Sequence, residues 1–277
     1  MNFSRYKPFL RIIGCVMLLV LSQAVASYVV AFALGGYELF SGTLSFAETD
    51  QLIYQLATEH YTEVLLFSYV LILISVFFMA RLRKKTFLEY TSLGKKAQPA
   101  LLILGLLAGL AGAFWSTIAV GSIPWPEQWM ADYMEESATL ITPKPLLDLI
   151  ATVFAGPLIE EILFRGLIYE SFCRMVPAGA AVIFQGIAFA SVHSTPIWMI
   201  YAGFMGCLLG YLRKRTGSIW PSLAMHIGFN GASYLLEPWM AEYGNDGAAI
   251  AIMFAASAFL LLLAMYGVNY RTRELKK

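Results

Sequence analysis

Eight apolar stretches, most of them close to the length that crosses a bilayer as a helix, dominate this sequence. They cover roughly residues 9–34, 61–80, 98–121, 145–172, 177–193, 197–212, 218–236 and 247–269. About 20 apolar residues in a helix span the hydrocarbon core, where backbone polar groups must be satisfied within the protein. Hydrophobic residues make up 59% of the 277 residues and charged residues only 13%. The sequence therefore predicts an all-α, polytopic membrane helix bundle with about eight transmembrane helices.

Basic residues gather in every second loop, which predicts the orientation of the bundle. Lysine and arginine fill the segments 5–11, 81–96, 213–215 and 271–277, together with Arg174. The alternate loops are acidic, and Lys144 is their sole basic residue. By the positive-inside rule both termini are expected to be cytoplasmic, in a multi-pass protein of the cell membrane. The lipid bilayer is the expected environment, and this sidedness makes nucleic acid an unlikely partner.

The chain is expected to form one membrane domain in three parts. Residues 1–144 hold the N-terminal spans and outer loops, 145–236 a helical core, and 237–277 the last span and a cytoplasmic tail. An aromatic segment in the second outer loop contains Trp125, Trp129 and Tyr133. Membrane anchoring is its favoured interpretation, with a binding role as the alternative.

The fourth stretch carries three ionisable residues that are costly inside a membrane: Glu160, Glu161 and Arg165. Glu161 and Arg165 are four residues apart in the order that favours an ion pair on a helix. Glu160 points about 100° away and lacks that partner, which leaves it available as a general base. Gly156-Pro157 just before the acids predicts a kink or a local opening.

His193 ends the fifth stretch and is followed by Ser194-Thr195-Pro196. A histidine at a helix end is more often a cap or an interfacial residue than a catalyst. However, the fifth and sixth stretches hold only ~17 and ~16 apolar residues, about 25 Å at 1.5 Å per residue. Their connecting turn is therefore expected to lie below the outer surface, which would carry His193 inward.

In the seventh stretch His226 and Asn230 are four residues apart and so project from one helix face. A hydrogen-bonded contact between helices fits this pair. A pair of donors for a developing oxyanion fits it as well. Gly203, Gly206 and Gly210 in the sixth stretch are typical of close helix packing.

Taken in order, the motifs Glu-Glu-x-x-x-Arg, Phe-x-x-x-His and His-x-x-x-Asn resemble those of the CAAX prenyl protease type II and bacteriocin-processing (CPBP) intramembrane proteases. The resemblance covers roughly residues 145–236, with Glu160, Phe189 and His226 beginning the three motifs. It implies hydrolysis of peptide bonds in a membrane-associated protein or peptide substrate. By this resemblance Glu160 activates water, His193 helps to position it, and His226 and Asn230 stabilise the oxyanion. Glu161 and Arg165 would then hold the architecture of the site.

The need for a metal stays open at this point. Glu160, His193 and His226 could supply the three protein ligands of a catalytic zinc. The histidines lie in separate stretches without an H-E-x-x-H motif, so a glutamate mechanism without a cofactor is favoured. Two other functions also fit intramembrane ionisable groups: a proton-coupled transporter, and a catalytically silent immunity or scaffold protein.

Overall fold

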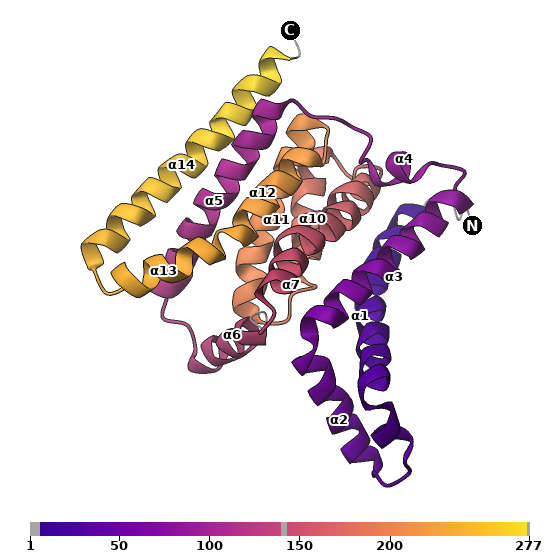
Figure 1. The fold of residues 1–277 in the computed structure, drawn as a ribbon. Helices are drawn as coiled ribbons and strands as arrows, with labels where there is room; N and C mark the ends of the chain where they lie inside the picture. The colour runs from indigo at the N-terminus through magenta and orange to yellow at the C-terminus, as the bar shows by residue number, and fades with distance from the viewer. Residues whose placement is uncertain (1–5, 140–142, 276–277) are drawn as a thin grey trace.

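The computed structural model describes residues 6–139 and 143–275, and the regular structure of these residues is entirely helical (Figure 1). The elements are α1 (Lys7–Phe40), α2 (Phe46–Glu59), α3 (Tyr61–Leu82), α4 (Phe87–Thr91), α5 (Pro99–Ser122), α6 (Glu127–Thr139), α7 (Pro145–Leu149), η2 (Ile150–Ala155), α8 (Gly156–Glu160), η3 (Glu161–Ile168), α9 (Tyr169–Phe172), α10 (Ala178–Ala190), α11 (Pro196–Thr216), α12 (Trp220–Gly231), α13 (Ser233–Tyr243) and α14 (Gly247–Glu274). The predicted all-α membrane fold is confirmed.

Four of these helices are long and apolar enough to cross a membrane: α1, α3, α5 and α14. The apolar α10 is shorter. The number of eight spans therefore stays a prediction. Two boundaries differ from expectation: α11 has 21 residues and includes the basic residues 213–215, and the seventh stretch divides into α12 and α13. The hydropathy pattern missed the extra turn of α11 because that turn is charged.

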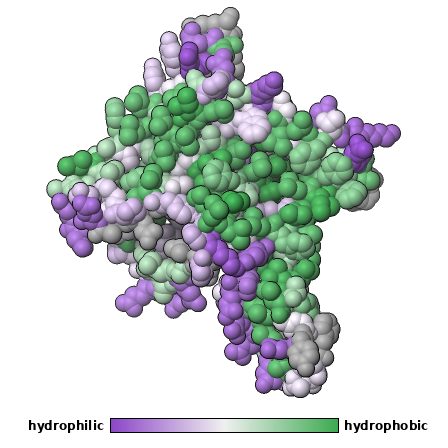
Figure 2. Space-filling view, viewed as in Figure 1, coloured by the Kyte–Doolittle hydropathy of each residue, from purple (hydrophilic) through white to green (hydrophobic). Residues whose placement is uncertain are grey.

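The helices form two groups in Figure 1. Helix α5 packs between α12 and α14, and α10 packs along α11, while α1, α2 and α3 form an arm on the other side. The approach of α5 to α12 needs glycine, because a Cβ on Gly109 would lie 1.9 Å from the Met225 carbonyl oxygen. Large apolar side chains such as Ile252 and Leu262 are each 70% exposed on α14. Figure 2 shows the hydrophobic residues across the middle of the molecule and the hydrophilic ones gathered at its ends, as a bilayer would require.

The segment 145–172, predicted as one helix, is a continuous run of five helical pieces. Two of them, η2 and η3, are π-helices, and they flank the short α8 that contains Pro157 and ends at Glu160. Proline lacks a backbone N–H and clashes with the preceding turn, and the Gly156 N–H bonds to Ala151 five residues back. The expected opening before the acids is therefore present as η2, whereas η3 was not expected. Such wide turns are frequent at functional sites.

Candidate active site

Glu161 and Arg165 form the expected ion pair, sealed inside the protein. Their Oε1 and Nη1 atoms are 3.0 Å apart and both side chains are 0% exposed. Arg165 also donates to the Gly206 carbonyl at 3.2 Å, and its guanidinium lies 4.5 Å from the centre of the Phe189 ring. Gln185 donates to the same carbonyl at 2.6 Å. This pair therefore joins the helices α10 and α11 to η3.

Glu160 faces a cavity instead. The cavity has a volume of about 840 Å³, and its lining includes Glu160, His193, His226 and Asn230. The Glu160 side chain is 26% exposed, in contrast to its buried neighbour Glu161. Because Glu160 and Glu161 lie about 100° apart on a helix, one carboxylate can open to the cavity while the next is enclosed.

His226 of α12 lies between the two carboxylates. Its Nδ1 is 3.2 Å from Glu161 Oε1, and its Nε2 is 3.5 Å from Glu160 Oε2. Among the described residues Glu160 forms no ion pair with an arginine, as expected, and its neighbour is His226, which the sequence analysis assigned to the oxyanion or, alternatively, to a zinc ion. The His226 side chain is only 6% exposed, and its contacts with the two carboxylates involve both ring nitrogens.

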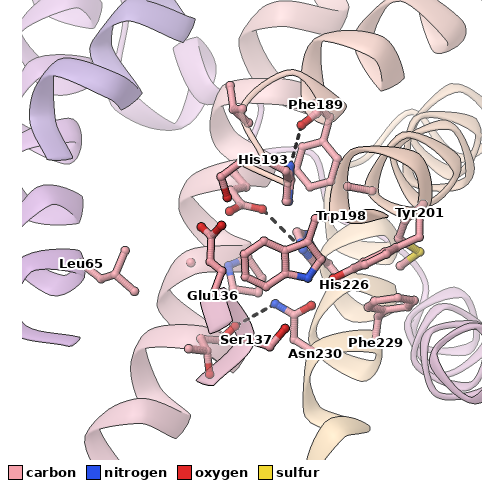
Figure 3. Close-up of a pocket in the computed structure, with 18 of the residues that line it drawn as sticks. Leu65, Glu136, Ser137, Phe189, His193, Trp198, Tyr201, His226, Phe229 and Asn230 are labelled. Atoms are coloured by element: carbon pink, nitrogen blue, oxygen red, sulfur yellow. Dashed lines mark hydrogen bonds and ion pairs between the residues drawn. The ribbon is translucent and has the colours of Figure 1, made fainter. Parts of the chain in front are cut away.

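His193 lies in the turn between α10 and α11 and reaches the same cavity (Figure 3). Its Nδ1 is 2.8 Å from the Phe189 carbonyl oxygen. A carbonyl only accepts hydrogen bonds, so Nδ1 carries a proton, and in the tautomer with that proton alone Nε2 is an acceptor. Thr195 caps α11 by accepting from the Trp198 N–H at 3.4 Å, which ends the turn. The depth of this turn in a bilayer stays a prediction.

Asn230 contacts the helix of the acids one turn beyond His226. Its Nδ2 donates to the Thr152 carbonyl oxygen of η2 at 2.8 Å. The pair His226 and Asn230 thus projects from one face of α12, as its spacing predicted, and both members bond to the segment 145–172. The contact between helices is present, and the oxyanion role stays a prediction.

Comparison with known proteins identifies the segment that carries these residues. Residues 142–232 match the model of the type II CAAX prenyl endopeptidase Rce1-like family. This segment, similar to an Rce1-like domain, makes up less than half of the chain. The protein named "Putative membrane peptidase YdiL" of Bacillus subtilis (strain 168) is 26% identical over 140 residues, which are 50% of this chain. Those residues span 57% of the length of that relative. No solved structure matches the chain.

The cavity is also lined by residues that lie outside the Rce1-like domain. They include Gln23 of α1, Tyr61 and Tyr69 of α3, and Ser116 of α5. The sequence analysis assigned no site residue to these first spans, because one polar or aromatic residue in an apolar stretch carries no local signal of what it faces. A Cβ on Gly156 would lie 2.9 Å from the Tyr69 hydroxyl, so α3 packs directly on the opening before the acids.

Helix α6 belongs to the segment predicted as an outer loop, and it also forms a wall of the cavity. Tyr133, Glu136 and Ser137 of α6 line it. The Tyr133 ring packs edge to face against Trp198 and Tyr201, with centroids 6.1 Å and 6.5 Å apart. Burial raises the pKa of the Tyr133 phenol, which therefore stays neutral. The aromatic segment around Trp129 thus reaches the site of the Rce1-like domain, beyond the anchoring role expected for it.

The residues proposed as zinc ligands do not form a metal cluster here. Among residues 6–139 and 143–275, no group of three or more histidine, cysteine or acidic side chains is placed to hold a metal ion. A catalytic zinc requires three such ligands close together. Glu160 and His226 approach each other, whereas His193 makes its contact with the Phe189 carbonyl. The donor set does not fit a zinc site as it stands.

Proposed function

We propose that this protein is an intramembrane endopeptidase that hydrolyses peptide bonds of a membrane-associated protein or peptide. The observation that carries the proposal is the open carboxylate of Glu160, which shares one cavity with His193, His226 and Asn230. The match to an endopeptidase family over residues 142–232 supports it, as does the similarity to a protein named as a membrane peptidase.

In the proposed mechanism Glu160 is the general base. Its carboxylate takes a proton from a water molecule, and the water oxygen attacks the carbonyl carbon of the substrate. Nε2 of His193 accepts the second hydrogen of this water and so orients it. When the tetrahedral intermediate collapses, the C–N bond breaks and Glu160 returns its proton to the leaving nitrogen. The products are a new carboxyl terminus and a new amino terminus.

His226 and Asn230 stabilise the oxyanion of the intermediate in this mechanism. A protonated imidazole donates from both nitrogens, so His226 can bond to Glu161 through Nδ1 and to the oxyanion through Nε2. The pair of Glu161 and Arg165 then acts through His226 by holding its ring in place. These two residues are positioning residues, as they bond to His226 and to the surrounding helices.

We also propose that no metal takes part and that both termini are cytoplasmic. The start of α1, the end of α14 and α4 all lie toward one end of the bundle, while α2 and α6 lie toward the other (Figure 1). The basic segments 81–96 and 213–215 flank α4 and end α11, which supports a cytoplasmic assignment for that end. Reporter fusions at residues 90 and 130 should report opposite sides of the membrane.

Hydrolysis can be tested directly with purified protein in detergent and a fluorescently labelled peptide library. In water enriched in oxygen-18, each cleavage should place one heavy oxygen in the new carboxyl terminus. The Glu160→Gln variant should produce no fragments, while the Glu135→Gln variant, which changes an exposed residue of α6, should cleave as the parent does. Proton flux in liposomes without any cleavage would instead support a transporter.

A further inference from the structure

The described wall of the cavity carries several acidic residues. Its described lining includes Glu136, Asp148 and Glu160 but no lysine or arginine. A low-dielectric cleft with charge of one sign concentrates ligands of the opposite sign. A substrate that presented a carboxylate here would depend on the two histidines alone.

The three acids differ in their partners. Asp148 accepts a hydrogen bond from Thr62 at 2.5 Å, and Glu160 faces His226. The Glu136 side chain belongs to the lining of the cavity, as does Trp198, and both are drawn in Figure 3. The Glu136 carboxylate forms no ion pair with a described arginine, lysine or histidine.

Two helix faces place aromatic rings on the wall of the cavity to which this carboxylate also belongs. Tyr133 and Glu136 are three residues apart on α6 and so share a face, and Trp198 and Tyr201 do the same on α11. The Tyr133 ring is perpendicular to both rings of α11, at 89° and 90°. Aromatic faces attract cations, tryptophan most strongly, and a nearby carboxylate adds to this attraction.

We infer that Glu136, Trp198, Tyr133 and Tyr201 form a specificity subsite for a positively charged side chain of the peptide substrate, at the α6 end of the active-site cavity. The inference rests on the proposed peptidase activity of this cavity, because it assigns the substrate class of the same site. Lysine and arginine combine an apolar stem with a cationic head, so they suit a cavity with aromatic walls and one carboxylate.

Binding tests the subsite separately from cleavage. Two peptide libraries with the same random apolar positions would carry either lysine or norleucine at one central position. Their affinities would be measured on the Glu160→Gln protein, which is expected not to cleave, and on that protein with Glu136→Gln or Trp198→Leu added. We expect the lysine library to bind roughly 3- to 10-fold more tightly, and this preference to fall toward one in both added variants. Glu135→Gln is the matched control, because it removes the same charge from an exposed position outside the lining.

Equal affinity for the two libraries, or a lysine preference that survives Glu136→Gln, would overturn the inference. Tighter binding of a third library with glutamate at the central position would overturn it as well. If the parent cleaves peptides without any preference for lysine, the subsite is wrong and the proposed peptidase activity stands. If the parent binds the lysine library preferentially but cleaves nothing, the peptidase activity is wrong and the cation-binding site stands.

Discussion

Two faces of one helix, at adjacent residues, have opposite environments in this protein. On the Glu161 face, the carboxylate and its arginine are completely enclosed and joined to three helices. On the Glu160 face, the carboxylate opens to a cavity of about 840 Å³ and has a single histidine neighbour. The difference shows that two identical side chains at consecutive positions can be enclosed on one face and open to a cavity on the other. His226 contacts both faces and links them.

The largest difference between the faces is expected in catalysis. Glu160→Gln removes the proposed base and keeps the shape of the side chain, so turnover should fall by roughly 10²- to 10⁴-fold or more. The folded yield should stay close to that of the parent, because the Glu160 side chain is already partly exposed. Peptide cleavage and size-exclusion profiles measure the two effects. Full activity in this variant would remove the proposed mechanism.

On the enclosed face, the principal loss should be one of stability. Glu161→Gln leaves the Arg165 charge buried without its partner, which should lower the free energy of unfolding by about 3–5 kcal/mol. Denaturant titration in detergent would measure this loss. The double variant Glu161→Gln/Arg165→Met should be more stable than Glu161→Gln, because it removes the unpaired charge as well. If Glu161→Gln unfolded like the parent while losing activity, the comparison of the two faces would be wrong.

Asn230 lines the same cavity as Glu160, and its substitution tests whether it takes part in the chemistry or only joins two helices. If Asn230 donates to the oxyanion, Asn230→Ala should lower kcat by roughly 10²- to 10³-fold with a smaller effect on KM. Loss of its bond to the Thr152 carbonyl should also cost about 1 kcal/mol of stability.

Asn269→Ala is the matched control for Asn230→Ala. Asn269 also bonds between helices, accepting from the Tyr211 hydroxyl at 2.6 Å, and it lies outside the cavity lining. The Asn269→Ala variant should be less stable than the parent but should keep its kcat. If the two variants had equal effects on kcat, Asn230 would serve only as a contact between helices.

The sequence predicted the enclosed face more fully than the open one. The spacing of Glu161 and Arg165 determines their contact within one helix, so the ion pair could be predicted from local geometry. The contacts of His226 with both acids bring together residues 65 and 66 positions apart in the chain. Only the resemblance of the motifs placed these residues in one site, and it gave no position for the ring.

The remaining walls of the cavity could not be predicted because nothing local marks them. Tyr133 and Glu136 belong to a segment that reads as an amphipathic outer loop, and their role depends on how α6 packs on α11. The π-helix η3 was missed for a related reason, since the hydropathy of the segment is the same for an α-helix and a π-helix. Gly156-Pro157, by contrast, acts on the backbone itself, and the opening that it predicted is present.

The smallest effect is expected from removal of metal ions. Because the described donors do not form a group that could hold a metal, incubation with a strong chelator should leave peptide cleavage unchanged, and elemental analysis should find no stoichiometric zinc. The matched comparison uses His193→Ala and His226→Ala. In a glutamate mechanism both variants should lose activity with no change in metal content. One equivalent of zinc in the parent that disappears together with activity in both histidine variants would make Glu160 a ligand, and the open face would then bind a metal through a rearrangement of His193.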